Sequence, residues 1–488
     1  MARQLFNSTE KSNFILNMTE EQYSKFASIG LITACCMVSL FTSLPVITSR
    51  NMYSLSAGGL AVSGVICMIL AIIALIKKYI SGKALVPVYA FGAMIIWAVV
   101  SLINSYDKII SLYGYEGRGE GLFAIVFYAG FFITASAVKN KKPFKSVIYG
   151  IVCTGLLNSV IGIIQVFTGK ISNYKSVALD LKIYAASGFS QSPLFLAMFL
   201  TLAIIASLMG FMNENSKGKK IFFIICSCIF SFVMIFTYSL IGICGLVLSI
   251  VFAVVSVVVT KVPKINILSV LSVIVPAVTA VFIVNTVGIG DVTSYRLYDG
   301  RILWWADSYM RISASGEPDS RSVNIDDTYD VYYTLNTKTI DIIERYGLTG
   351  TGPDQLAFPQ IYNVPEYAES LGYEISDIIA QNRGIFDRVY NEYLYTASTR
   401  GIPSLIVLVI ILISVIVSGF GKVKKEYSWE YLCMFLMTLA GILIFLIGCS
   451  NTAFSPVFWS VAGLVNSTAF QNMKDSVQKD SDKKEKSE

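Results

Sequence analysis

Residues 386–413 read FDRVYNEYLYTASTRGIPSLIVLVIILI, and they change within a few positions from a polar, charged segment to an apolar one. The apolar part belongs to a series of long runs along the chain, and each run approaches the roughly twenty residues that a helix needs to cross a bilayer. A transmembrane β-barrel would instead show segments of about ten residues with alternating hydrophobicity. The stretch therefore predicts an all-α polytopic membrane protein with a polar cluster where one span begins.

The composition of the whole chain supports this class. Of its 488 residues, 55% are hydrophobic and 14% are charged, whereas soluble domains carry about 25% charged residues. Residues 1–26 are polar and precede an apolar run that is long enough to span, so no signal peptide is expected there. About twelve spans are predicted, at 27–48, 57–76, 85–104, 121–138, 147–168, 191–212, 220–238, 239–260, 265–285, 401–419, 427–449 and 453–472.

The lysines indicate an orientation for these spans. Every second connection is rich in lysine, and the positive-inside rule places those connections in the cytoplasm. Both termini are then cytoplasmic, with residues 1–26 as an N-terminal segment and 473–488 as a charged tail. The segment 286–400 becomes a large extracytoplasmic loop domain between the spans of 27–285 and those of 401–472. The lysines concerned are Lys77, Lys78, Lys83, Lys139, Lys141, Lys142, Lys145, Lys217, Lys219, Lys220, Lys261, Lys264, Lys422, Lys424 and Lys425.

Arginine has the opposite distribution. Eight of the eleven arginines lie in 286–400, which contains one lysine, Lys338. Arginine binds phosphate and carboxylate groups through paired hydrogen bonds, so these side chains are expected either to bind an anion or to pair with acidic residues of the same loop. The predicted spans hold almost no ionisable residues, unlike the spans of ion-coupled transporters. Polar chemistry is therefore expected at the outer ends of the helices.

Histidine is absent from the chain, and the nine cysteines all lie in or at the ends of predicted spans. No disulfide is expected in 286–400, no zinc or iron site is expected, and no cofactor is expected. Near neutral pH, the group left to accept a proton is a carboxylate whose pKa has been raised by burial.

Two outer segments before the large loop are candidates for a site. YGYEGRGEGL (113–122) places Arg118 among glycines, which allow a backbone to approach a ligand closely; a plain tight turn is the alternative. AASGFSQSPLFLAMF (185–199) offers Gln191 as a donor to a sugar or phosphate. A helix cap at Ser192 explains that second segment nearly as well.

Two further candidates lie within the large loop. RLYDGRILWWADSYMRI (296–312) places Arg301 and Trp305 on one helical face, four residues apart. A tryptophan beside an arginine suits either a membrane interface or stacking on a sugar. The glycine-containing turn YGLTGTGPDQL (346–356) follows later and precedes the stretch quoted first.

The polar half of that first stretch predicts an amphipathic helix over 384–398, resting on the outer membrane surface. Arg388, Asn391, Glu392 and Tyr395 then share one face of the helix. Glu392 is a candidate proton acceptor, and the alternative is that it forms a surface ion pair with Arg388, four residues earlier.

In order and topology these segments resemble the O-antigen ligase and Wzy-type O-antigen polymerase family. RILWWADSYMRI, GLTGTGPDQL and DRVYNEYLYTASTRGIPSLI are similar to its outer-loop motifs, and YGYEGRGEGL is similar to its glycine–arginine segment before span four. SGFSQSPLFLAMFL and FTYSLIGICGLVL occupy the places of two more motifs, so the resemblance covers roughly residues 110–420. Tyr390 stands where the family usually has His, and Leu240 stands where it has Arg.

The resemblance implies a glycosyltransferase of the bacterial plasma membrane. It would transfer or polymerise a glycan from an undecaprenyl-diphosphate-linked donor to a glycan, lipid or protein acceptor, by inverting transfer without a metal. Arg301 and Arg118 are then expected to stabilise the leaving diphosphate, and Glu392 is expected to be the base. The other candidates orient the acceptor or bind substrate: Tyr390, Asn391, Trp305, Arg388 and Gln191.

Two other classes stay open. A lipid-linked oligosaccharide flippase or transporter also suits twelve spans, although it should line a central cavity with charge. An inactive scaffold of an envelope glycan machine would leave the divergent motif without a function. Nucleic acid is not an expected partner, and the choice between ligase and polymerase is open because both would use the same donor.

Overall fold

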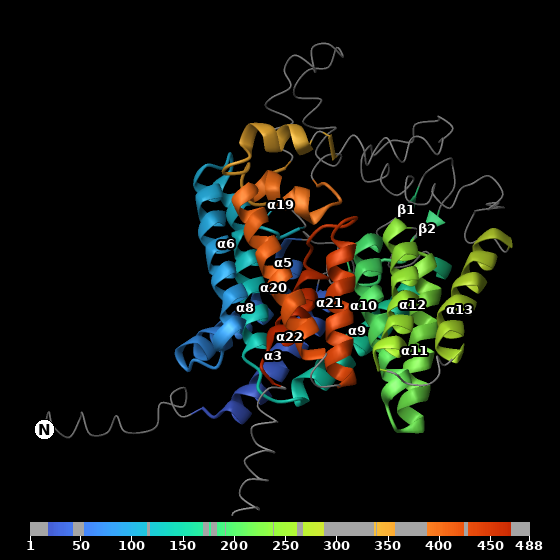
Figure 1. Ribbon diagram of the computed structural model, residues 1–488. Coiled ribbons are helices and arrows are strands. Elements are labelled where there is room, and N and C mark those ends of the chain that lie inside the picture. Colours follow the sequence, from blue (N-terminus) through green and yellow to red (C-terminus); the bar gives the residue numbers. More distant parts are fainter. Residues whose placement is uncertain are drawn as a thin grey trace, which may run out of the picture.

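The structure is a computed structural model, and it describes residues 18–41, 53–114, 118–168, 175–176, 183–190, 192–237, 239–260, 267–286, 336–337, 339–356, 388–423 and 428–469. This part of the chain is a bundle of helices (Figure 1) with one small antiparallel ladder, β1–β2. The elements are α3 (Glu20–Phe41), α5 (Tyr53–Ile76), η2 (Gly82–Ala84), α6 (Leu85–Ile103), α7 (Lys108–Tyr113), α8 (Leu122–Ser136), α9 (Lys142–Thr168), β1 (Lys175–Ser176), β2 (Ile183–Tyr184), α10 (Pro193–Asn213), α11 (Lys217–Ile235), α12 (Leu240–Thr260), α13 (Ile267–Thr286), α19 (Glu392–Arg400), α20 (Ile402–Val423), α21 (Trp429–Ile444) and α22 (Ser455–Asn466).

Each sequence-predicted span falls on one of these helices, although several ends differ. Within the described ranges, seven helices are long and apolar enough to cross a membrane: α5, α6, α9, α10, α11, α12 and α20. Three more, α8, α13 and α21, are apolar over shorter described lengths. α3 begins at Glu20, seven positions before the expected span, and α22 has only 12 residues. The chain is therefore a helical, membrane-embedded protein, and the number of twelve crossings stays a prediction.

The interior of the bundle is built around α10. All residues from Pro193 to Phe211 are buried, and the helix packs against α9, α11, α12 and α21. A helix that is apolar on all sides must be enclosed by protein or lipid. By contrast, large apolar side chains on the outer faces of α6, α13 and α20 are exposed, among them Ile96, Phe282 and Val417. Such faces suit contact with lipid.

Lysine-bearing connections meet at one end of the bundle. Lys139 Nζ, between α8 and α9, lies 3.0 Å from Thr468 Oγ1, just beyond α22. Lys422 Nζ, at the end of α20, donates to the carbonyl of Ser467 at 2.6 Å. α19 lies at the opposite end, at the top of the bundle in Figure 1. Lys139 and Lys422 thus lie at the end opposite α19, and the compartment that each end faces stays a prediction.

Candidate functional site

Six buried charged side chains meet at the α19 end of the bundle, and we call them the charged cluster. Each of these residues is at most 8% exposed, so water solvates these charges poorly and protein groups must stabilise them instead. They come from three stretches far apart in the sequence, which belong to the segments 113–122, 346–356 and 386–413. The cluster consists of Arg118, Glu120, Asp354, Arg388, Glu392 and Arg400.

α19 begins at Glu392 because Asn391 caps it. The side-chain oxygen of Asn391 accepts the backbone N–H groups two and three residues later, at 3.0 and 3.1 Å, which satisfies donors that a helix start leaves open. The helix expected over 384–398 is therefore wrong at 388–391, which is not helical. The expectation that this helix rests on the membrane surface is also wrong, because Tyr395 to Arg400 are buried within the protein.

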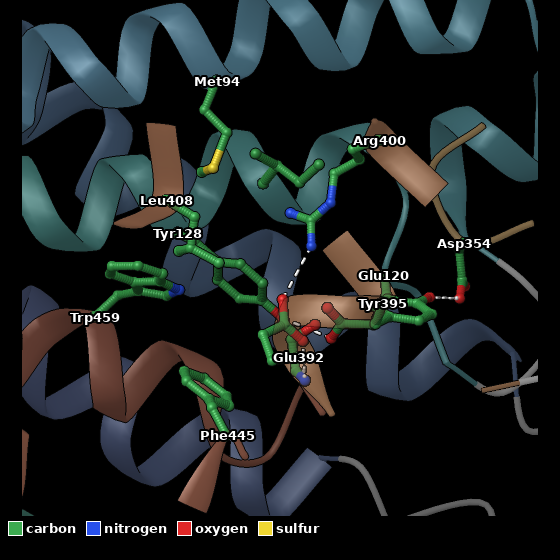
Figure 2. A pocket seen from close by; sticks show the side chains of 12 residues that line it. Met94, Glu120, Tyr128, Asp354, Glu392, Tyr395, Arg400, Leu408, Phe445 and Trp459 are labelled. Atoms are coloured by element: carbon green, nitrogen blue, oxygen red, sulfur yellow. Dashed lines mark hydrogen bonds and ion pairs between the residues drawn. The ribbon is translucent and has the colours of Figure 1, made fainter. Parts of the chain in front are cut away.

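The carboxylate of Glu392 is bonded at both oxygens. Oε1 accepts from Arg400 Nη2 at 2.9 Å and from Thr396 Oγ1 at 3.1 Å, and Oε2 accepts the backbone N–H of Ser450 at 2.6 Å. Figure 2 shows this ion pair from within the site. The alternative ion pair of Glu392 with Arg388 is wrong: Arg388 precedes the helix, so the spacing of one helical turn does not exist there.

Arg388 instead turns toward α10 and the connection between α21 and α22. Its Nη1 lies 3.4 Å from the carbonyl oxygen of Ser450 and 3.7 Å from Cys449 Sγ. Its guanidinium carbon lies 5.2 Å from the centre of the Phe195 ring, a stacking contact that fixes the plane of a guanidinium. This contact brings the outer segment 185–199 against the segment that carries α19.

Arg118 reaches the glycine-containing turn. Its Nη1 lies 3.3 Å from Asp354 Oδ1, and the O–H of Tyr395 donates to the same oxygen at 2.5 Å. Burial raises the pKa of Tyr395 well above its usual range, so the phenol remains a donor. Asp354 therefore ties the 113–122 loop to α19.

The turn itself is fastened to the end of α19 by backbone hydrogen bonds. The N–H groups of Thr351 and Gly352 donate to the carbonyls of Ser398 and Thr399, each at 3.0 Å. Gly401 ends α19 with φ +84°, and a Cβ there would collide with the carbonyl oxygen of Leu348 in the turn. Only glycine fits this junction without strain.

Glu120 closes the 113–122 loop immediately before α8. Its Oε1 accepts the O–H of Tyr128 at 2.6 Å. Burial raises the pKa of Glu120 to about 7; the Tyr128 hydrogen bond and the Arg388 charge oppose the rise, and Asp354 and Glu392 add to it. Glu120 is thus a buried carboxylate whose pKa is shifted toward neutral pH.

A small cavity lies in the middle of the cluster, with a volume of about 20 Å³. On this measure about 10–15 Å³ holds one water molecule, so the space accepts a hydroxyl-sized group but not a sugar ring. One wall is polar and includes Glu120, Glu392 and Arg400, and the other is apolar and includes Leu408 and Trp459 (Figure 2). Any glycan must therefore approach from outside this space.

No protein-family model matches this chain, and no curated protein matches it. The resemblance of short motifs therefore stays a hypothesis, and the functional argument rests on the cluster. Within the described ranges, no three cysteine, aspartate or glutamate side chains are placed to hold a metal ion together.

The structure brings together Arg118, Arg388 and Glu392 of the sequence-predicted site. Asn391 caps α19, and Tyr390 is partly buried against the apolar core. Arg301, Trp305 and Gln191 lie outside the described residues.

Four contributors had not been assigned to the site by the sequence: Glu120, Asp354, Arg400 and the connection 449–451. The signal for the connection was its composition, because GCSNTAFSP (448–456) is a polar interruption between two apolar runs. Arg400 and Asp354 were visible as charges within candidate segments, but nothing in the sequence indicated what they pair with.

Proposed function

We propose that this chain is a membrane glycosyltransferase of the O-antigen ligase or polymerase type. It would take a glycan from an undecaprenyl-diphosphate-linked donor at the outer face of a bacterial plasma membrane, with both termini in the cytoplasm. The observation that supports the proposal is the charged cluster, in which three arginines are buried at one end of an apolar bundle.

The diphosphate of such a donor suits guanidinium groups. Arginine binds phosphate oxygens through paired hydrogen bonds, and fixed positive charge stabilises the anion that leaves in the transition state. In this proposal Arg118 and Arg388 face the diphosphate, and the 286–400 segment contributes Arg301. Arg388 is already oriented by Ser450 and by the Phe195 ring, so little entropy is lost when it binds.

The amphiphilic shape of the donor also suits the bundle. Its polyprenyl chain would stay in the bilayer beside exposed apolar helix faces, and its head group would reach the end of the bundle where the cluster lies. Among the described residues, the buried arginines Arg118, Arg388 and Arg400 lie at this end, and Lys139 and Lys422 lie at the other. Trp305 and Gln191 would contact the glycan.

The test is turnover in liposomes that contain the purified protein and a lipid-linked repeat unit. A ligase or polymerase releases undecaprenyl diphosphate and extends or transfers the glycan. A flippase moves the intact donor across the bilayer, and a scaffold does neither. Either of those outcomes would reject the proposal.

Matched variants make this assay specific to the cluster. Arg118→Gln and Arg388→Gln should each lower turnover at least tenfold, because each removes a charge from the anion site. Lys217→Gln removes an exposed charge at the start of α11, and it should turn over as the wild type does. An equal loss of turnover in all three variants would show that the activity does not depend on the charged cluster.

A further inference from the structure

Three buried carboxylates surround one small cavity, and they differ in how their oxygens are bonded. We infer that Glu120, held in position by Tyr128, is the group that takes the proton from the acceptor hydroxyl. This inference rests on the proposed function and assigns the base to a residue other than Glu392.

Glu392 is poorly suited to accept a proton. Both of its oxygens already accept hydrogen bonds, and the donors are the Arg400 guanidinium, the Thr396 hydroxyl and the Ser450 N–H. Protonation would discharge a buried ion pair and leave the guanidinium without its anion. The geometry assigns Glu392 to holding Arg400 and the 449–451 connection.

The carboxylate of Asp354 also already accepts hydrogen bonds. Its Oδ1 accepts from both Arg118 and Tyr395. The backbone at Asp354 has φ +61°, so the side chain is placed by a constrained turn. Loss of its charge would release the loop that carries Arg118 from α19.

Glu120 has a different environment. Its one hydrogen bond within the described residues comes from Tyr128, a neutral donor, and it leaves Oε2 for another group. The ion pairs of Arg118 and Arg400 in this cluster are made with Asp354 and Glu392, and the Arg388 charge opposes the rise in the pKa of Glu120 without outweighing burial. The carboxylate lines the cavity, where a hydroxyl-sized group fits.

Titratable and charged groups act on Glu120 from each neighbouring element. Tyr128 lies on α8, Asp354 on the glycine-containing turn, Arg388 before α19 and Glu392 at its first position. Burial dominates and raises the pKa of Glu120 to about 7. A base with a pKa near the working pH is the most effective kind, because it is both available and strong enough.

The proposed step is a displacement at the anomeric carbon of the donor. The acceptor oxygen forms a bond to the anomeric carbon of the donor as the bond from that carbon to the diphosphate oxygen breaks. The electron pair of the broken bond leaves with undecaprenyl diphosphate. The hydroxyl proton passes to Glu120, which then returns it to water.

This assignment predicts the pH dependence of turnover. The rate should rise with pH and level off above about pH 7, as Glu120 loses its proton. Tyr128 stabilises the charged form of Glu120. Tyr128→Phe should therefore shift the rising part of the pH–rate profile to higher pH, while the maximal rate changes only a few-fold. If the role of Tyr128 were structural alone, Tyr128→Phe would lower the maximal rate and leave the pH at which the rate rises unchanged.

The experiment is the liposome assay run across this pH range. Glu120→Gln should lose at least 100-fold in turnover, and Glu120→Asp should keep part of it. The control is Glu214→Gln: Glu214 is also 6% exposed but lies after α10 and pairs with Lys145 at 3.2 Å, so its variant should retain turnover.

The outcomes separate the two proposals. If the wild type releases undecaprenyl diphosphate and Glu120→Gln does so at a similar rate, Glu120 is not the base and the proposed function survives. If the wild type releases none at any pH, the proposed function fails and this inference fails with it. If Glu120→Gln does not fold, the pH–rate profile of Tyr128→Phe is the test. A profile whose rising part stays at the pH seen for the wild type overturns the inference.

Discussion

The ion pair between Glu392 and Arg400 should be a principal support of the α19 end. The side chains of Glu392 and Arg400 are 6% and 9% exposed, and the donor and acceptor are 2.9 Å apart. We expect Glu392→Gln and Arg400→Gln each to lower the free energy of unfolding strongly. The double variant should lose much less than the sum of the two.

The magnitude follows from burial. Removing one partner of a buried pair costs about 3–5 kcal/mol, because the other charge is left uncompensated. In Glu392→Gln the new amide also cannot accept from both Arg400 and the Ser450 N–H as the carboxylate does. The double variant contains no stranded charge, so the coupling energy should be about 2–3 kcal/mol.

The assay is a double-mutant cycle, in which unfolding of the purified protein is followed in detergent. The matched control is the exposed pair Lys25–Glu21, which is also on one helix, with side chains 62% and 65% exposed. Its coupling should be below about 0.5 kcal/mol. If the Glu392 and Arg400 effects add within about 0.5 kcal/mol, the two charges do not depend on each other and our description of the cluster is wrong.

Three further predictions concern the glycine-containing turn, the carboxylate of Glu120 and the orientation of the chain in the membrane. Gly401→Ala should cost at least about 2 kcal/mol in unfolding free energy, because of φ +84° and the close carbonyl, whereas Gly421→Ala, where a Cβ meets nothing within 4 Å, should be neutral or stabilising. Native Glu120 has its pKa raised from 4.5 to about 7, so it binds a proton more tightly than in the unfolded chain. The stability of the wild type relative to Glu120→Gln should then fall by about 3 kcal/mol as pH rises from about 4.5 to above 7, and a pH-independent difference in unfolding free energy would contradict this. A cysteine replacing Leu348, which is 69% exposed, should react with an impermeant thiol reagent on intact cells, whereas Ser216→Cys should require permeabilised cells; the reverse pattern would overturn the orientation.

The helices could be predicted from the sequence because hydropathy acts along one continuous stretch of chain. The gathering of the outer segments was predictable in the same way, since alternating spans return the chain to the same end. The partner of Glu392 was not predictable. It depended on where α19 begins, and a local cap by Asn391 decided that against the helical periodicity of 384–398.

The role of Glu120 was hidden for a different reason. Its pKa depends on burial and on charges that arrive from distant segments, such as Arg388 and Asp354. Those distances exist only after the helices have packed. The contribution of the 449–451 connection could not be predicted for the same reason. Its backbone groups belong to the site only because they bond to Glu392 and Arg388 in the folded protein.

The most direct test of the account is the binding of undecaprenyl diphosphate to the purified protein in lipid nanodiscs. Wild type, Arg388→Gln and Lys217→Gln would be measured side by side. A lost charge-assisted hydrogen bond costs about 1.5–3 kcal/mol, which is at least about tenfold in Kd. The account predicts that Arg388→Gln binds at least tenfold more weakly and that Lys217→Gln binds as the wild type does. Equal affinity of the wild type and Arg388→Gln, or no binding by the wild type, would contradict it.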